Sequence, residues 1–350
     1  MSVNSPEPAY FWDSATGSWV KAVSGQAGEY VWNPSLNAWE KGTIGAEYLW
    51  NDTTKSWDMG PGGQYVWDST SKTFIPNTNQ GGGRYYWDST SKTFVLNTGF
   101  AAETQSFLSR ISSAPSETRK RVINTLITAL KSAGVWNKLD TLYVFAAADA
   151  QSALLNWKSS SYGASAVNTP TFTTDRGYVS NGTTSYLDTG FIPSTNGVNF
   201  AQNSASIGVW IRSTQSDVAA PLIAAGASDP TKSAILAAWR SVVGIGTQLN
   251  DLTSGTVGSG IATRIGLSVL DRSAGTREAY RNGASIGTDS VTSVGLPTVA
   301  AYVCCRNNNG TASGFTTDQI SAHFMGSHLT AAEHLALYNA LSAYMTAVGA

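Results

Sequence analysis

The sequence contains few residues that support metal, redox or acid–base chemistry. Only three histidines and two cysteines occur in 350 residues, charged residues make up 13%, and the net charge is −1. No stretch reaches the roughly 18 uncharged apolar residues that a membrane span needs. The first residues lack both the basic start and the apolar core of a signal peptide. We therefore expect a protein made in the cytoplasm, with no membrane insertion.

The few cysteines and histidines are poorly spaced for a metal site. Cys304 and Cys305 are adjacent, so in a strand their side chains point to opposite faces, and we expect buried small residues. His323, His328 and His334 crowd together, and zinc favours imidazole. Their spacings of five and six put no neighbouring two on one helical face. We predict no metal and no cofactor.

Carboxylates in catalytic arrangement are also missing. A typical glycosidase places two carboxylates either side of the scissile bond, yet no glutamate occurs between Thr118 and Arg277. Glu278 lies in a predicted hairpin, and Glu333 follows Thr330 at the spacing of a helix capping box. The one Gly-x-Ser-x-Gly match, residues 283–287, lies in the same hairpin rather than at a strand-to-helix turn. We predict no catalytic residue.

What the sequence does contain is an aromatic repeat. Five copies of Tyr-X-Trp, each followed by Asp or Asn, begin 17 to 20 residues apart, and a second Trp or Phe falls seven residues after the Trp in every copy. A fixed internal spacing with variable separations indicates a repeated structural unit. The repeat aromatics are Tyr10, Trp12, Trp19, Tyr30, Trp32, Trp39, Tyr48, Trp50, Trp57, Tyr65, Trp67, Phe74, Tyr85, Trp87 and Phe94.

Each repeat is predicted to be a β-hairpin. Tyr and Trp two apart share one face of a strand, and the Asp or Asn that follows can start a turn. A lone hairpin is marginal in water, so the aromatic faces should form the core of a small β-solenoid, or stack on sugars or a partner surface. Residues 1–100 hold six Lys and Arg against nine acids, which argues against nucleic acid. We assign residues 1–99 to attachment or oligomerisation.

A helical neck is predicted over residues 100–160. The pattern turns helical from Glu103 to Ile111, and Pro115 is expected to open a longer helix that Gly134 ends. Its apolar stripe lies opposite a basic face that we interpret as solvated. A further helical segment is expected from Asp149 to Trp157. The stripe consists of Val122, Ile123, Leu126, Ile127 and Leu130, and the basic residues are Arg119, Lys120, Arg121 and Lys131.

Residues 161–350 predict two packed antiparallel sheets, which makes the chain mainly β. Short strand patterns alternate with turn signals such as Asn181-Gly182, Asn282-Gly283 and Asn309-Gly310. The expected strands are Ser185–Thr189, Ala205–Arg212, Pro221–Ala225, Ala234–Trp239, Val242–Gly246, Ile261–Leu270, Arg277–Arg281 and Val299–Cys305.

Four motifs in this region resemble the concanavalin A-like, laminin-G-like jelly roll. The first two read Asn-Gly-Thr-Thr-Ser-Tyr-Leu-Asp at 181–188 and Ser-Ile-Gly-Val-Trp-Ile-Arg at 206–212. The third is Tyr-Arg-Asn-Gly at 280–283, and the fourth is Leu-Thr-Ala-Ala-Glu at 329–333, which leads to Leu337-Tyr338. In that family the last motif precedes a closing helix. The four matches span about residues 165–345 in the family's order, and the resemblance implies a lectin-like jelly roll with a terminal helix.

The preceding block, Phe107 to Lys158, resembles a module of tailed-bacteriophage minor structural and tail-fibre proteins that is fused to the same jelly roll. The matching segments begin at Thr118, Ala133 and Asp149. Membership would imply a virion component, such as a tail fibre, spike or capsid decoration, that displays a carbohydrate-binding domain for host attachment. Composition is compatible with this role. The aromatic repeats lie outside the resemblance and show only a loose analogy to cell-wall-binding hairpin repeats.

Polar loops beside a stacking ring would bind a glycan, because sugars offer hydroxyl groups and an apolar face. A polar loop at 306–309 is the richest cluster of this kind, followed by Trp239-Arg240 and then Asp188. A tight exposed turn is the alternative explanation of the loop. The glycan-binding candidates are therefore Trp239, Arg240, Arg306, Asn307, Asn308, Asn309 and Asp188.

We expect a phage virion protein whose partners are other virion proteins, host surface polysaccharide and further copies of itself. A homo-oligomer is expected, with a trimer favoured, because exposed aromatic faces and an apolar helix stripe both need partners. Two alternatives stay open. One is a cell-wall-binding protein whose aromatic repeats hold the sugar, and the other is a polysaccharide depolymerase.

Overall fold

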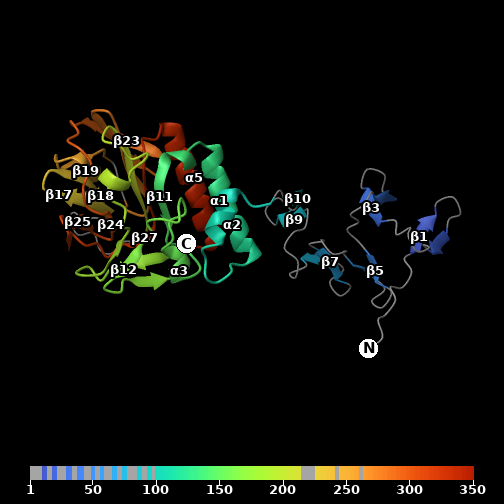
Figure 1. The fold of residues 1–350 in the computed structure, drawn as a ribbon. Coiled ribbons are helices and arrows are strands. Elements are labelled where there is room, and N and C mark those ends of the chain that lie inside the picture. The colour runs from blue at the N-terminus through green and yellow to red at the C-terminus, as the bar shows by residue number, and fades with distance from the viewer. Residues whose placement is uncertain are drawn as a thin grey trace. The chain divides into compact units, whose positions relative to one another are not determined.

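The computed structural model describes ten short strands between residues 10 and 96, and then residues 99–213, 225–240, 244–259 and 263–350. The chain divides into two units, Met1–Gly99 and Phe100–Ala350. Of the first unit, only the backbone of the strands is described. Figure 1 shows the elements of each unit along the chain. No helix within the described ranges is long and apolar enough to cross a membrane.

The first unit contains five hairpins, which confirms the prediction from the repeats. Each hairpin is its own two-stranded antiparallel sheet, and no described strand of one hairpin pairs with a strand of another. The strands are β1 (Tyr10–Asp13) with β2 (Ser18–Lys21), β3 (Glu29–Asn33) with β4 (Ala38–Gly42), β5 (Leu49–Asn51) with β6 (Ser56–Asp58), β7 (Tyr65–Asp68) with β8 (Thr73–Pro76), and β9 (Tyr85–Asp88) with β10 (Thr93–Leu96).

The seven-residue spacing of the repeat has a direct structural meaning. In every hairpin the two aromatic positions are Cα partners across the strands: Trp12 with Trp19, Trp32 with Trp39, Trp50 with Trp57, Trp67 with Phe74, and Trp87 with Phe94. Directly opposed residues are the pairs that stabilise an antiparallel ribbon, and aromatic pairs are among the stronger ones. The choice between a solenoid core and a binding surface depends on side chains outside the described residues, so it stays open.

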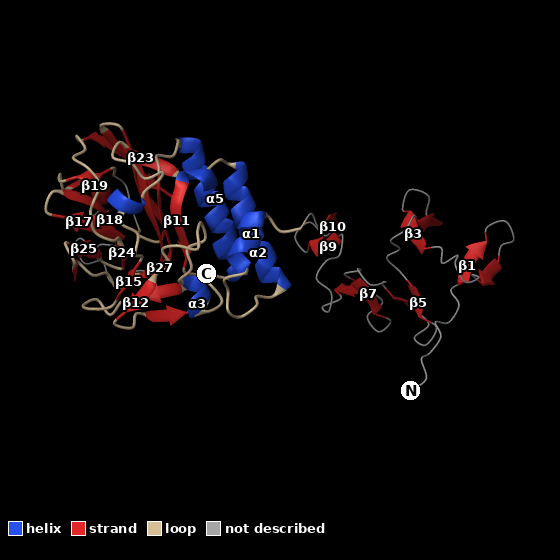
Figure 2. Cartoon of the chain, viewed as in Figure 1, coloured by secondary structure: helices blue, strands red, loops and turns tan. Residues whose placement is uncertain are grey.

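The second unit is a sandwich of two mainly antiparallel sheets, as the sequence predicts (Figure 2). We call one the helix-covered sheet. Its strands, in spatial order, are β13 (Thr171–Thr173), β14 (Gly177–Val179), β27 (Gln319–Gly326), β16 (Ser204–Ser213), β21 (Gly266–Ser273), β22 (Thr276–Arg281) and β23 (Ala284–Ser290), while β11 (Leu139–Val144) also pairs with β27.

We call the other sheet the second sheet. Its strands, in spatial order, are β12 (Ser165–Val167), β15 (Tyr186–Asp188), β24 (Tyr302–Val303), β17 (Ala225–Asp229), β18 (Lys232–Arg240), β19 (Gly244–Asp251) and β20 (Gly255–Val257). Two further strands, β25 (Arg306–Asn308) and β26 (Thr311–Ser313), form a hairpin in which β25 runs parallel to β17. The predicted strands Pro221–Ala225, Val242–Gly246 and Ile261–Leu270 extend into segments outside the described residues.

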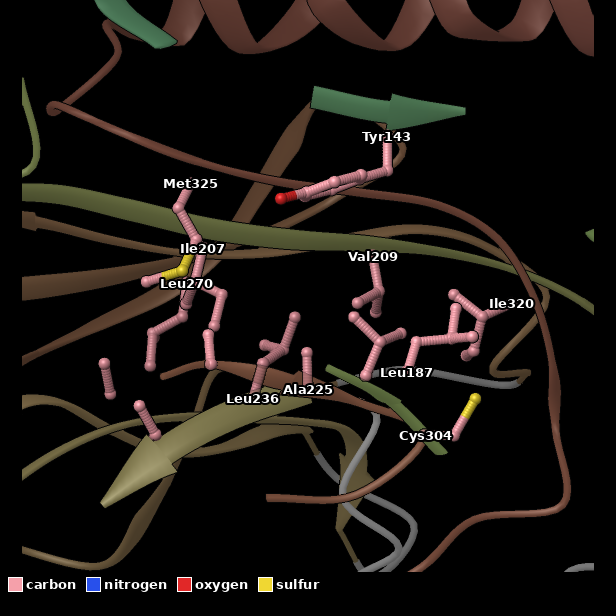
Figure 3. Packing of buried hydrophobic residues seen from close by; sticks show 14 of the residues in the cluster. Tyr143, Leu187, Ile207, Val209, Ala225, Leu236, Leu270, Cys304, Ile320 and Met325 are labelled. Carbon is pink, nitrogen blue, oxygen red and sulfur yellow. The ribbon is translucent and has the colours of Figure 1, made fainter. Parts of the chain in front are cut away.

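Apolar side chains fill the space between the sheets. Alternate residues of β16, including Ile207 and Val209, and Leu187 of β15 have essentially no solvent exposure. Figure 3 shows these side chains pointing toward one another, with Leu270 and Met325 beside them. Because neighbouring residues in a strand face opposite ways, the intervening residues of the helix-covered sheet form a second apolar surface.

Helices cover that second surface. They are α1 (Ala102–Leu108), α2 (Glu117–Ser132) and α5 (Ala331–Val348), which lie side by side in Figure 1. From α2, the residues Ile123, Leu126, Ile127 and Leu130 are buried, so the predicted stripe is correct at these positions. Three shorter elements complete the unit: η1 (Trp136–Lys138), α3 (Ala150–Ala153) and α4 (Pro193–Asn196).

The predicted neck is part of this compact unit. Strand β11 pairs with β27, and α1 and α2 pack in the same apolar cluster as α5. Within α2 the basic residues are not simply solvated: Arg119 pairs with Asp175 at 2.6 Å, and Lys131 pairs with Glu103 at 2.7 Å. An apolar stripe needs a surface to cover, and here the sandwich supplies that surface.

Two predicted helix boundaries are wrong. The helix α2 begins at Glu117 rather than Pro115, because the Ser116 side chain accepts a hydrogen bond from the Arg119 N–H and acts as the N-cap. The helix expected from Asp149 to Trp157 ends at Ala153. Beyond it, Asn156 Oδ1 accepts hydrogen bonds from the Leu142 and Lys158 N–H groups, so the segment is tied to β11 instead.

Candidate functional site

An aromatic cluster lies on the outward side of the second sheet. Leu187 and Val303 point into the core, so the residues next to them, Tyr186 and Tyr302, face the other way. The centroids of these two rings are 4.4 Å apart, and Tyr186 lies 6.4 Å from the ring of Phe315. We call Tyr186, Tyr302 and Phe315 the aromatic face.

The rings of the aromatic face differ in accessibility. Tyr302 is only 8% exposed, whereas Tyr186 and Phe315 are half-buried. The pKa of Tyr302 is raised above its usual value, mainly by burial and to a smaller extent by the contact with the Tyr186 hydroxyl. Tyr302 therefore stays neutral at physiological pH, and the two outer rings offer the apolar surface.

Of the polar candidates from the sequence, Asp188 lies next to these rings. Asp188 is the Cα partner of Tyr302 across the β15–β24 pair, and its carboxylate accepts a hydrogen bond from the Gly190 N–H at 2.9 Å. Along the chain, Tyr302 precedes the β25–β26 hairpin and Phe315 follows it. The structure therefore brings Asp188 and the base of the 306–313 hairpin to one aromatic surface.

The hairpin itself divides into structural and exposed parts. Arg306 is half-buried, and its Nε donates to the Ser313 hydroxyl at 3.1 Å. Asn307 is 4% exposed: its Nδ2 donates to the Ala300 carbonyl at 3.0 Å and its Oδ1 accepts from the Gly310 N–H at 2.7 Å. The side chain of Asn307 thus shapes the loop, while Asn308 and Asn309 are exposed.

The candidates Trp239 and Arg240 end strand β18, and their side chains lie outside the described residues. None of the three rings of the aromatic face was among the glycan-binding candidates from the sequence. A usable signal was present for Tyr186, because it alternates with Asp188 in a strand whose middle residue, Leu187, is apolar. No short-range signal joins either residue to Tyr302 or Phe315.

The cysteines are buried and free. Cys304 lies in the core between the sheets, and burial raises the pKa of its thiol to about 12. Cys305 is buried as well, and burial raises the pKa of its thiol. The prediction of two buried small residues is confirmed. Cys304 adopts a left-handed backbone (φ 70°), so it forms the corner between β24 and β25 and is not part of a continuous strand.

Two of the three histidines converge on one aspartate. Asp271 accepts from His328 Nδ1 at 2.5 Å and from His334 Nε2 at 3.1 Å, and its carboxylate also accepts the Leu329 N–H at 2.9 Å. The ring of His334 stacks on Tyr280 with centroids 3.7 Å apart. Asp271 thus fastens the start of α5 to β21. Within the described ranges no group of three His, Cys, Asp or Glu residues is arranged to hold a metal ion.

A second polar cluster is structural. Asp251 bridges Arg272 at 2.6 Å and Arg277 at 3.2 Å, and all three side chains are fully buried. Arg277 also pairs with Asp289 at 2.5 Å. Since β19 belongs to the second sheet and β21 and β22 to the other, these ion pairs join the two sheets. The two arginines and two aspartates balance one another in formal charge.

The glutamates take the positions predicted from the sequence. Glu333 and Thr330 form a complete capping box at the start of α5. Glu278 lies on β22, in the β22–β23 hairpin, and accepts a hydrogen bond from the Ser285 hydroxyl at 2.5 Å. The Gly-x-Ser-x-Gly match is part of that hairpin, as expected.

No protein-family model and no curated protein sequence matches the chain. Solved structures show a distant likeness. Domain 4 of AbnA, an extracellular arabinanase from Geobacillus stearothermophilus solved with arabinotriose, is 16% identical with a TM-score of 0.38, over 57% of this chain and 98% of that one.

Two further solved structures resemble this chain equally distantly. The binding domain of botulinum neurotoxin serotype G is 14% identical with a TM-score of 0.40, over 58% of this chain and 51% of that one. A Trypanosoma rangeli sialidase in complex with sialic acid is 12% identical with a TM-score of 0.40, over 63% of this chain and 39% of that one. The chain thus spans about half of the neurotoxin domain and two fifths of the sialidase, and similarity at this level does not indicate a ligand.

Proposed function

We propose that the second unit binds a glycan on the aromatic face, and that the chain is a bacteriophage virion protein that displays this unit toward the host surface. The observation that carries the glycan proposal is that Tyr186 lies against the rings of both Tyr302 and Phe315, with Asp188 opposite Tyr302 on the neighbouring strand. Aromatic rings stack on the apolar face of a sugar, and a neighbouring carboxylate accepts hydrogen bonds from its hydroxyl groups.

The virion role is supported by the resemblance of residues 107–158 to phage structural modules and by the four jelly-roll motifs. The five hairpins then serve for attachment to other virion proteins or for association between copies. We also propose that the unit binds without hydrolysis, since Glu333 is used in a helix cap and Glu278 lies in a hairpin. A depolymerase would need a pair of carboxylates across the bond.

A second candidate function has an observation of its own. The register of the hairpins sets two aromatic residues directly opposite each other five times over. A row of such pairs suits the repeated stacking of a polysaccharide, in which case the repeats would hold the sugar and the sandwich would be the structural part.

Binding of the full chain to a panel of immobilised bacterial surface polysaccharides tests these assignments. Replacing Tyr186 with Ala should weaken binding about 5- to 150-fold, by analogy with the 1–3 kcal/mol of a base stacked on a ring, whereas Tyr186→Phe should keep most of it. Phe172→Ala is the matched control, because Phe172 is a half-buried ring in the helix-covered sheet that packs on Tyr178.

The two candidate functions give opposite results. If the aromatic face binds, Trp67→Ala and Trp87→Ala leave binding unchanged. If binding falls in those variants and survives Tyr186→Ala, the repeats hold the sugar. Equal binding by Tyr186→Ala and Phe172→Ala to every polysaccharide that the wild type binds would exclude the aromatic face.

A further inference from the structure

Arg176 and Arg212 have no acidic partner within the described part of the chain. Arg212 lies on β16 and donates from Nη1 to the Gln319 Oε1 atom, at the long distance of 3.4 Å. Arg176 immediately precedes β14, and its guanidinium makes no hydrogen bond to any described residue. Since an arginine carries several N–H donors, most donors of this pair are available to an acceptor from outside the chain.

The unused donors are accessible to solvent. Both arginine side chains are half-buried. Arg212 Nε is enclosed, whereas Arg212 Nη2 and the guanidinium nitrogens of Arg176 are exposed. Gln319 adds a further donor, because its Nε2 is also accessible and makes no hydrogen bond to a described residue. A ligand at the surface can therefore reach donors from three side chains.

The two arginines approach the same part of β27 from opposite sides. That strand lies between β14 and β16. The Arg176 carbonyl oxygen accepts from the Ser321 hydroxyl at 2.6 Å, and Arg212 contacts Gln319, two residues away on the same strand. The register between β16 and β27 shifts at Arg212, which has no Cα partner on β27. Such a bulge redirects a side chain and is common beside functional sites.

The neighbouring carboxylates do not neutralise this pair. Asp175 is paired with Arg119 at 2.6 Å. Asp318 is paired with Arg264 at 3.3 Å. The pKa of Arg212 is lowered, mainly by burial and to a smaller extent by the positive charge of the other arginine. Two like charges close together raise the free energy of the protein, and an anion between them lowers it.

We propose that Arg176, Arg212 and Gln319 bind the anionic group of an acidic polysaccharide, either a carboxylate or a phosphate. Guanidinium groups match the oxygen atoms of both anions with paired hydrogen bonds, and the Gln319 amide donates to a remaining oxygen. Two cations suit an isolated anionic group, whereas a nucleic acid needs a continuous row of them. The choice of a polysaccharide rests on the proposed function, but the anion site itself does not.

Titration calorimetry of the full chain at low ionic strength tests the site with matched probes. They are trigalacturonic acid, which carries carboxylates, galactotriose with one added phosphate, and galactotriose itself, which is neutral. We expect saturable binding of at least one anionic probe, with an affinity that falls as salt is added, and the tighter probe identifies the group. Galactotriose should not displace that probe.

Arginine variants test which side chains hold the probe. Arg212→Gln and Arg176→Gln should each weaken its binding at least about tenfold, because each removes charge-assisted hydrogen bonds. Arg212→Lys retains the charge and should recover part of the loss. All three variants should change the melting temperature little, since neither guanidinium is in an ion pair with a described residue. Lys232→Gln is the matched control, because it removes one positive charge from β18 in the second sheet.

Failure of both anionic probes to bind would overturn the proposal. An equal loss of affinity in Lys232→Gln would also overturn it, because the probe would then respond to the overall charge of the protein. Tighter binding of a single-stranded oligonucleotide at the same arginines would replace the polysaccharide with a nucleic acid. Tyr186→Ala should leave the binding of the anionic probe unchanged, so the failure of this site and the failure of the glycan site on the second sheet can be told apart.

Discussion

His323 should make the stability of the second unit depend on pH. It lies on β27 with no solvent exposure, its Nδ1 is 3.0 Å from the Gly208 carbonyl oxygen, and its Nε2 is buried without a partner. The ring stacks on Tyr143 with centroids 6.1 Å apart. Burial lowers the pKa of His323 to about 4, since a charged imidazolium would lose its hydration there.

The direction of the effect follows from the two pKa values. The unfolded chain has an ordinary histidine pKa of about 6.5, and the folded pKa is lower, so the unfolded state binds the proton more readily. Above about pH 6.5 His323 is neutral in both states and does not reduce the free energy of unfolding. As pH falls from about 6.5 toward 4, the unfolded chain takes up the proton first, and the free energy of unfolding decreases. Linkage then gives a loss of about 2 kcal/mol from His323 alone between neutral pH and pH 5.

Urea unfolding of the wild type and of His323→Phe at pH 7.5 and pH 5.0 measures this contribution. The variant should be less stable at pH 7.5, because it loses the hydrogen bond to Gly208, but the gap should narrow by about 2 kcal/mol at pH 5.0. All other ionisable groups are the same in both proteins, so their contributions cancel in the comparison. A gap that stays constant between the two pH values would refute a neutral, buried His323.

Other predictions address stability, catalysis and assembly. Asp251→Asn should cost about 3–5 kcal/mol by chemical denaturation, because it leaves Arg272 buried without its carboxylate, whereas Asp289→Asn should cost less since Asp289 is 31% exposed. Thr330→Ala should cost about 1 kcal/mol by removing the α5 cap, which thermal unfolding would reveal. The protein should release no reducing ends from polysaccharide; release that is abolished by Glu278→Gln would contradict this. Mass photometry should show that the full chain associates and that residues 100–350 alone do not. If both proteins are monomers, the repeats have no role in association.

Local signals in the sequence predicted local structure well. The seven-residue aromatic spacing predicted hairpins, which the structure confirms, and the Thr330-to-Glu333 spacing predicted a real capping box. Alternating strands predicted the sandwich. In the hairpins and the capping box the interacting residues are close in the chain, and for the sandwich each strand shows its own alternation, so hydrophobic period and turn chemistry are sufficient.

Contacts between distant residues could not be predicted in this way. Asp271 binds His334 across 63 residues, and Arg272 binds Asp251 across 21, and nothing in the sequence around either aspartate marks its partner. Helix α2 looked like part of a separate neck for the same reason, because its apolar stripe does not reveal the sheet that it covers. The burial of Asn307 is a further case. Its side-chain amide donates to one backbone group and accepts from another, and the polar sequence of the loop does not reveal these hydrogen bonds.

The position of β27 has a consequence for how the protein is made. This strand bonds to β11, β14 and β16, which come from residues 139–144, 177–179 and 204–213. None of these contacts can form until residues 319–326 have left the ribosome, whereas each aromatic hairpin needs only about a dozen consecutive residues. During translation the hairpins can therefore form early, whereas the apolar strands β11, β14 and β16 stay exposed until β27 is available for pairing. A ribosome stalled before residue 319 should carry chains that bind chaperones, and one stalled well beyond residue 350 should not.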